Sequence, residues 1–195
     1  IDEFINKPKA MVIDDVRHSR KIFELWSKAE LEAKGIYEVE FDNSNKKDEQ
    51  WYINTNQSFA FADGKITASY GLATAKAHAD TLWTQQDSDD GDLPSDKSVG
   101  DVKVEGLKTI KIKEVKKQAA AILQDTDWYI TRKADAGTAI PSAISTHRAA
   151  VRTKSNEMET AIDNASDVDA LSALYVYNDD DPPTRPLGEF PILEI

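Results

Sequence analysis

The chain contains no cysteine among its 195 residues. This absence excludes disulfide bonds, thiolate metal sites and a cysteine nucleophile. Glycine is also sparse, with eight residues, and none has the spacing of a phosphate-binding loop or a dinucleotide-binding turn. No apolar run approaches the roughly 20 residues that a membrane-spanning helix needs. We therefore expect no insertion into a membrane.

Basic residues are fewer than acidic residues in this chain. The sequence carries 24 Lys and Arg residues against 35 Asp and Glu residues, a formal net charge of −11. Proteins that bind DNA or RNA usually present a basic patch that neutralises phosphates, and an acidic surface disfavours such contacts. Nucleic acid is therefore not an expected partner. The hydrophobic share of 40% is nevertheless high enough for folded domains.

Signatures of catalysis are missing as well. The three histidines, His18, His78 and His147, lie far apart, and none has a metal-binding spacing. No serine stands in the Gly-x-Ser-x-Gly setting of a nucleophile elbow. We predict that the protein is not an enzyme and that it uses no cofactor and no metal.

The acidic run Asp87–Asp92 is the one segment that suggests a cation, because hard cations bind clustered carboxylate oxygens. A calcium loop of the EF-hand type needs ligands at its first, third and fifth positions before a glycine at the sixth. Counting back from Gly91 places Gln86 first and Ser88 third, so this register fails. A solvated linker is the favoured interpretation and a metal site the alternative.

The pattern predicts a small antiparallel β-rich domain with one short helix over residues 1–86. Ser27 and Glu30 have capping-box spacing, and Gly35 stands where a left-handed helix end is wanted. Ile36–Phe41 then alternates with the period of a strand, and the pair Asp63–Gly64 between two apolar runs is a strong hairpin signal.

The second half has a helical texture. Residues 87–105 are predicted to form an acidic linker, 106–175 a helical hairpin or bundle, and 176–195 an extended tail laid along another surface. Pro141 suits the first turn of one helix and Asp167 the cap of another. The expected fold class is α+β, with a small antiparallel β-rich N-terminal domain followed by the helical region and the tail.

Two groups of residues are candidates for interaction. Trp51 and Tyr52 belong to an aromatic-rich stretch that forms either a core or a surface for carbohydrate or protein. The helical region adds an aromatic residue and three cations, whose ordinary explanation is exposed ion pairing with nearby aspartates. These residues are Trp128, Arg132, Arg148 and Arg152.

Two ordered segments resemble proteins of tailed bacteriophages. The first, Thr126–Lys133 followed by Gly137–Pro141 and His147–Arg152, is similar to a Thr-Asp-Trp segment of phage tail and tail-fibre-assembly-like proteins. The second, Ala33–Val39, resembles their short helix that ends at Gly-Ile and leads into a strand. The likeness spans about residues 23–174 and is strongest to marine and cyanobacterial phages. His147 departs from the tyrosine that the family often has, and the 87–100 insertion is long.

The resemblance implies a scaffold without transferable catalytic residues, in which Trp128 would be a buried anchor. We expect a virion protein of the tail, baseplate or fibre attachment apparatus that contacts other tail or fibre proteins and forms a homo-oligomer. A tail-fibre assembly chaperone and a receptor- or glycan-binding module are the alternatives.

Overall fold

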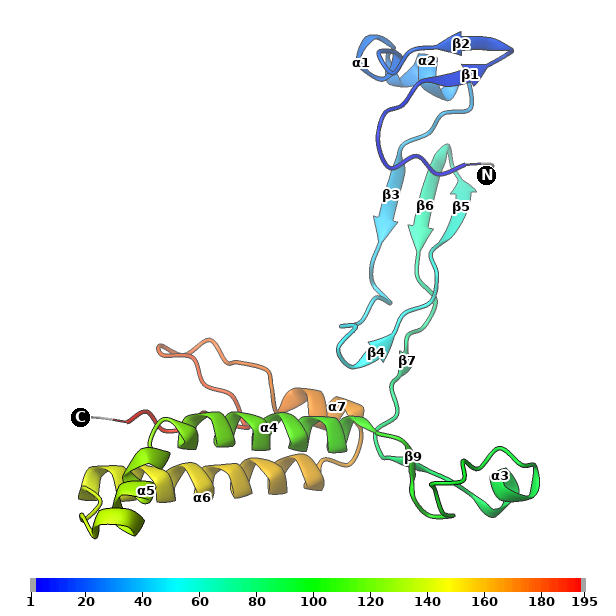
Figure 1. Cartoon of the computed structure of the whole chain (residues 1–195). Coiled ribbons are helices and arrows are strands. Elements are labelled where there is room, and N and C mark those ends of the chain that lie inside the picture. The colour runs from blue at the N-terminus through cyan, green and yellow to red at the C-terminus, as the bar shows by residue number, and fades with distance from the viewer. Residues whose placement is uncertain (1–2, 194–195) are drawn as a thin grey trace. The chain divides into compact units, whose positions relative to one another are not determined.

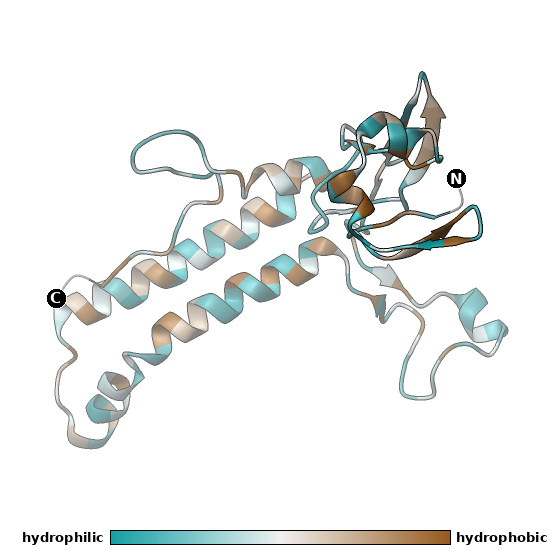
Figure 2. Cartoon of the chain, turned by 90° about the horizontal axis from the view of Figure 1, so that it is seen from above, coloured by the Kyte–Doolittle hydropathy of each residue, from teal (hydrophilic) through white to brown (hydrophobic). Residues whose placement is uncertain are grey.

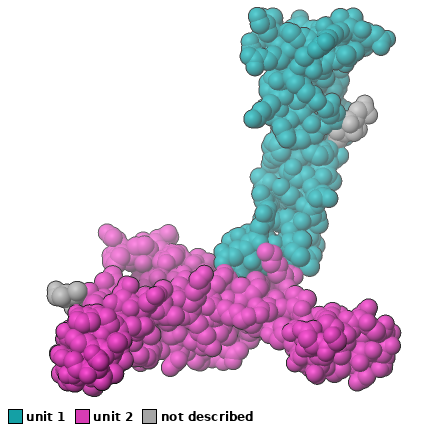
Figure 3. Space-filling model, viewed as in Figure 1, with its two compact units in different colours: residues 1–74 teal, residues 75–195 magenta. Residues whose placement is uncertain are grey.

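The computed structural model describes residues 3–193 and divides the chain into two compact units, residues 1–74 and 75–195 (Figure 3). Strands dominate the first unit and helices the second, so the predicted α+β class is confirmed. The division lies at 74/75, however, and not at the predicted residue 86.

A three-stranded sheet forms the centre of the first unit (Figure 1). Its order is β3 (Val39–Asp42), β6 (Lys65–Ser69) and β5 (Ser58–Ala62). The predicted hairpin at Asp63–Gly64 joins β5 to β6, with φ of 51° and 75° at the two turn residues, as a two-residue hairpin loop requires. Because the chain reverses once before β5 and once after it, β6 runs parallel to β3. The sheet is therefore mixed and not purely antiparallel as predicted.

One face of this sheet is apolar. Strand alternation places Phe41 beside Ala68 and Ala68 beside Phe59, while Glu40 and Thr67 lie on the opposite face. Val39, Phe61 and Ile66 complete the apolar face. Two aromatic rings cover part of it, since Phe4 packs 5.1 Å from Phe59 and Tyr37 packs 4.7 Å from Phe61, measured between ring centroids.

Short elements complete the first unit. The predicted capping box of Ser27 and Glu30 opens α2 (Lys28–Glu32), and Gly35 has the expected positive φ of 75°. The remaining elements are β1 (Met11–Ile13), β2 (Val16–His18), α1 (Ile22–Leu25), and β4 (Tyr52–Ile53), which pairs with β7 (Thr74–Ala75). The buried apolar residues of this unit are few, namely Ile22, Trp51, Tyr52 and Ala68.

Two long antiparallel helices, α4 (Leu107–Gln124) and α6 (Ser142–Asn164), lie side by side in the second unit (Figures 1 and 2). Their buried residues recur every three or four positions, which sets one side of each helix against the other. Those on α4 are Leu107, Lys111, Val115 and Ala119, and those on α6 are Ile144, His147, Arg148, Val151, Ser155, Met158 and Ile162. Hydrophilic and hydrophobic bands accordingly alternate along both helices (Figure 2).

Two shorter helices join this pair. The helix α5 (Asp127–Ala136) connects α4 to α6 and ends at Gly137, whose φ of 68° fits the predicted stop. Pro141, which was predicted in the first turn of a helix, lies one residue before α6, at its N-cap. The helix α7 (Val168–Ala173) begins at Asp167, whose carboxylate accepts a hydrogen bond from the N–H of Ala170 at 2.8 Å. The predicted stop at Gly137 and the predicted cap at Asp167 are therefore confirmed.

The start of α4 explains why the second unit begins earlier than predicted. The N–H of Gly106 donates to Asp80 Oδ1 at 2.7 Å, and the N–H of Leu107 donates to the carbonyl of Ala77 at 2.8 Å. These bonds satisfy N–H groups that a helix start leaves unpaired. The bond from Gly106, and next that from Thr109, lowers the pKa of Asp80. Segment 77–80 thus belongs with the helices, a long-range pairing without a local sequence signal.

The predicted acidic linker 87–105 contains regular structure. Thr84 and Asp87 form a capping box at the start of α3 (Gln85–Asp89), and β9 (Val102–Val104) returns to pair with β8 (Thr81–Leu82). This segment is a loop whose two ends are held together by the pairing of β8 with β9. We call residues 81–104 the β8–β9 loop.

The C-terminal segment was predicted to lie along another surface, and the surface it covers belongs to its own unit. Leu187 is 3% exposed, and its N–H donates to the carbonyl of Leu174 at 3.0 Å. The Arg185 guanidinium lies 5.6 Å from the ring of Tyr175. Burial raises the pKa of Tyr175 to about 12. The tail therefore packs on its own unit around Leu187, whereas Ile192, nearer its end, is 87% exposed.

Among residues 3–193, no helix is both long enough and apolar enough to cross a membrane.

We predict that Gly106→Ala strongly destabilises the second unit. A Cβ at this position would lie 2.3 Å from the backbone carbon of Ala79, a contact that requires the backbone to move. The expected loss is about 3 kcal/mol or more of unfolding free energy, measured by urea titration of the helical circular dichroism signal.

The matched control is Gly91→Ala, where an added Cβ meets no atom within 4 Å. Its φ of +79° should cost only about 1 kcal/mol. Equal losses for the two substitutions would show that the contact with segment 77–80 does not hold the helix start.

Candidate interaction sites

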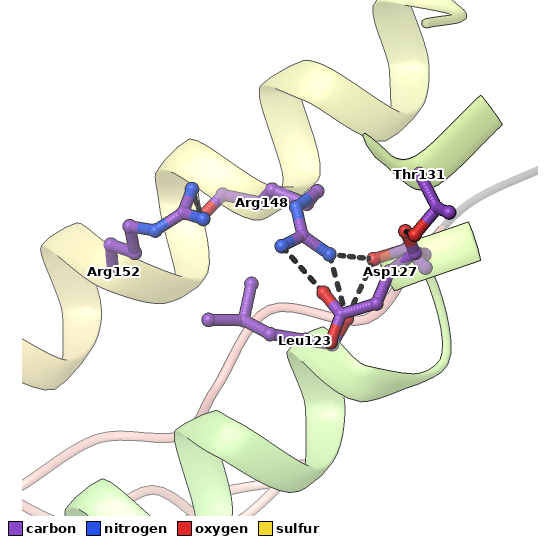
Figure 4. Close-up of polar contacts among 6 residues, drawn as sticks. Leu123, Asp127, Thr131, Arg148 and Arg152 are labelled. Atoms are coloured by element: carbon purple, nitrogen blue, oxygen red, sulfur yellow. Dashed lines mark hydrogen bonds and ion pairs between the residues drawn. The ribbon is translucent and has the colours of Figure 1, made fainter. Parts of the chain in front are cut away.

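A cluster of polar contacts that joins several helices of the second unit surrounds Arg148 (Figure 4). Its guanidinium, carried by α6, donates hydrogen bonds to the carbonyl of Leu123 at 2.7 Å and to Thr126 Oγ1 at 2.6 Å. A third bond, 2.8 Å long, reaches Asp127 Oδ1. Arg148 is 6% exposed, so its charge is buried and paired. The sequence favoured exposed ion pairs for these arginines, and for Arg148 that expectation is wrong.

Arg148 joins three helices because each acceptor belongs to a helix end. Leu123 lies in the last turn of α4, where carbonyl groups lack partners within the helix. Asp127 is the first residue of α5, where a carboxylate is favoured by the helix dipole. Thr126, between them, is itself 4% exposed and donates its hydroxyl to the Leu123 carbonyl at 3.0 Å. One side chain of α6 therefore fixes the turn from α4 into α5.

Arg152 has a different role, although it lies one turn further along α6. Its guanidinium donates to the Arg148 carbonyl at 3.3 Å, within its own helix, and the residue is exposed (Figure 4). It bridges no helices in the described structure.

An aromatic and cationic cluster is displayed by α5, a helix that buries no residue. The rings of Trp128 and Tyr129 lie 5.1 Å apart, and the Arg132 guanidinium lies 4.5 Å from the Trp128 ring. Trp128 is 55% exposed, so the prediction that it is a buried anchor is wrong. Stacking pre-orders these side chains, and aromatic and arginine side chains are enriched in protein interfaces. We call Trp128, Tyr129 and Arg132 the α5 cluster.

The first-unit candidates Trp51 and Tyr52 are 5% and 8% exposed. Lys47 Nζ lies 4.1 Å from the Tyr52 ring. Burial of both rings agrees with the core interpretation and leaves little of either ring to contact a glycan. Two aromatic residues of the sheet strands reach solvent instead, Phe41 and Phe61, which are 55% and 53% exposed. Neither was among the predicted interaction residues. The alternation of apolar residues in these strands predicted an apolar sheet face. It did not predict that this face would remain largely uncovered.

A groove of about 300 Å³ lies between the C-terminal segment and the helices. Phe190–Leu193 form one side, and the other includes Ile122, Thr126 and His147. The groove adjoins the Arg148 cluster through Thr126. It exists because the tail folds back, which the local sequence did not indicate.

No group of three or more metal-ligating side chains is present in the described part of the chain. Within the acidic run, Asp87 is committed to protein contacts with Thr84 and Lys103. The hydrogen bond from Lys103, followed by those from Thr84, lowers the pKa of Asp87 to about 2.

Comparison of the chain with protein-family models, with curated proteins and with solved structures gives no match.

We predict that Asp87 titrates near pH 2, measured from its side-chain carboxyl chemical shift. The pKa of Asp87 in the folded chain lies below its ordinary value of 3.8. The contacts of Asp87 therefore stabilise the β8–β9 loop at pH values above 3.8, and this stabilisation is lost as the pH falls through about 2. Lys103→Ala should raise the Asp87 pKa. Lys97→Ala, which removes a cation paired with Asp96, should leave it unchanged. An Asp87 pKa near 3.8 in the unsubstituted chain would contradict the prediction.

We also predict that Arg148→Ala lowers the unfolding free energy of the second unit by about 1–3 kcal/mol, because it removes a buried hydrogen-bond donor from the acceptors at the helix ends. The Asp127 side chain is 59% exposed, so it remains solvated after the substitution. Urea unfolding followed by helical circular dichroism measures the loss. Arg152→Ala, on the same helix but exposed, should change it by less than about 0.5 kcal/mol. Similar values for both variants would refute the bridging role of Arg148.

Proposed function

We propose that the chain is a virion structural protein of a tailed bacteriophage, part of the tail, baseplate or fibre attachment apparatus, and that it acts through contacts with other proteins. The phage assignment rests on the resemblance of Ala33–Val39 and of the segments between Thr126 and Arg152. A role in protein contacts is supported separately by the exposed side chains of both units.

The observation that carries the proposal is the α5 cluster. It lies within the segment that resembles tail proteins, and its Trp128 ring is 55% exposed. Arg148 anchors the start of the same helix through Asp127 at 2.8 Å. A helix whose start is held by Arg148 and that presents stacked aromatic and guanidinium groups is suited to docking on another protein, because few rotamers must be frozen on binding.

A tail-fibre assembly chaperone is the second candidate, because the same Thr126–Lys133 segment occurs in such proteins by the resemblance described above. A chaperone would use the α5 cluster transiently and would leave the finished particle. The glycan-binding alternative loses its motivation, since Trp51 and Tyr52 are buried.

Peptide mass spectrometry on gradient-purified particles, with copy number measured against the major capsid protein, tests the proposal. We predict a fixed, low multiple consistent with tail symmetry. Trp128→Ala should lower this copy number about tenfold or more, as expected for the loss of a central aromatic contact. The control is Val176→Ala, an exposed apolar residue of the same unit outside the α5 cluster, which should leave it unchanged.

Abundant protein in the infected lysate without any in particles would overturn the virion role and support the assembly chaperone instead. Equal incorporation of the Trp128→Ala and unsubstituted chains would keep the virion role but remove the α5 cluster from the proposal.

A further inference from the structure

The strand β5 (Ser58–Ala62) lies at an edge of the three-stranded sheet (Figure 1). It pairs with β6 on one side, and no other strand of the described residues pairs with it. The two-residue turn makes Ala62 and Lys65 the hydrogen-bonded pair next to the loop, so the N–H and C=O groups of Phe59 and Phe61 point away from β6. These backbone groups can hydrogen-bond to another strand.

This edge lacks the features that normally prevent pairing. Proteins protect edge strands with charged side chains, proline or bulges, and the sequence Ser-Phe-Ala-Phe-Ala of β5 contains no charge and no proline. The opposite edge, β3, carries two carboxylates: Glu40, which is paired with Lys65 at 2.7 Å, and Asp42. Of the two edge strands, β5 is the one without a charged side chain.

The side chains of β5 are also arranged symmetrically. The triplet Phe59-Ala60-Phe61 reads the same in both directions. An antiparallel pair centred on Ala60 therefore places each Phe59 opposite Phe61 of the second copy, on the apolar face. Ala60 meets Ala60 on the other face, where neither side chain is bulky. Two-fold pairing of a strand with itself requires this self-complementarity, and an unrelated partner strand would not need it.

We propose that two copies of this chain pair through β5, antiparallel and centred on Ala60, to form a continuous six-stranded sheet. Four hydrogen bonds would join Phe59 and Phe61 of each copy to those of the other. Each cross-strand phenylalanine pair also brings Phe61, 53% exposed, beside a Phe59 ring that is already covered by Phe4 of its own copy. This inference rests on the first unit alone and stands or falls independently of the proposed virion role.

Exposed apolar side chains in the first unit support an interface of this kind. Within the described part of the first unit, eight large apolar side chains are exposed and only four apolar residues are buried. The side chains left uncovered thus outnumber those in the core of this unit.

Charge favours the first unit over the second as the site of self-association. Residues 1–74 contain 13 acidic and 10 basic residues, a net charge of −3, so the remaining residues carry −8 of the total of −11. Two copies therefore repel each other less strongly through the first unit.

Single-cysteine variants test the register, because the chain has no cysteine of its own. In the proposed pair the two Ala60 Cα atoms lie about 4.5 Å apart, as in a non-hydrogen-bonded antiparallel pair, which a disulfide can span. Ala60→Cys in the full chain should therefore form a disulfide-linked dimer under mild oxidation, detected by non-reducing electrophoresis.

Ala62→Cys is the matched control. Ala62 is an exposed alanine on the same strand and face, but the proposed register places its two copies about 14 Å apart. It should not link to itself, and it should link to Ser58→Cys when the two variants are mixed. Random collision would link Ala62→Cys at least as well as Ala60→Cys. Equal linking of the two, or no linking of Ala60→Cys, would overturn the proposal.

Charge substitutions give a second, non-covalent measurement. Sedimentation of the unsubstituted chain should show concentration-dependent association to twice 21.7 kDa. Ala60→Lys and Ala60→Glu should each remain monomeric with an unchanged circular dichroism spectrum, since Ala60 is exposed, and an equimolar mixture should recover the dimer. A monomer at all concentrations, a trimer, or a variant that still dimerises alone would each refute the β5 pairing.

Discussion

The arrangement of the helical unit depends on a buried guanidinium. Arg148 comes from the middle of one helix and satisfies acceptors at the end of a second helix and the start of a third. A charge at 6% exposure is stable only when it is paired and hydrogen-bonded. The same requirement fixes the positions of α4 and α5 relative to α6, because a shift of either helix would leave the Arg148 charge without its acceptors. The position of the α5 cluster follows from this bridge, since Trp128 is the next residue after the acceptor Asp127.

The two units differ in how completely they bury their apolar residues. The second unit buries apolar residues at helical spacing and adds the tail, where Leu187 is almost fully covered. The first unit has an alternating sheet with a well-defined apolar face but only partial cover from Phe4 and Tyr37. A sheet of three short strands has little apolar area to bury by itself. Additional cover from another molecule would therefore stabilise the first unit more than the second.

Local signals in the sequence predicted local structure well. The capping box at Ser27, the hairpin at Asp63–Gly64 and the stop at Gly137 each depend on neighbouring residues, and each is present in the structure. The fold class followed from the change of period between the two halves. The tertiary pairings could not be predicted in this way. Nothing near Asp80 indicates that it receives the N–H of Gly106, and so the unit boundary was placed too late.

The candidate site residues were also predicted only in part, because their burial depends on tertiary pairings. Trp128, Arg148 and Arg152 were selected as a group, but burial separates their roles, and burial depends on partners distant in sequence. Arg148 is inside because its guanidinium is covered by Leu123, at the end of α4, and by Thr126, between α4 and α5. Trp128 is outside because α5 contributes nothing to the core. An aromatic residue beside a helix start fits a buried anchor and an exposed contact equally well until the packing of that helix is known.

The protein therefore exposes two different kinds of surface. The α5 cluster is a compact group of three side chains on an anchored helix, a geometry suited to a pocket or groove of another protein. The β5 edge is a row of backbone groups with a palindromic side-chain pattern, a geometry suited to its own copy. The two surfaces lie on different units, and they share no residue. A substitution in one of them therefore tests that surface without altering the contacts of the other.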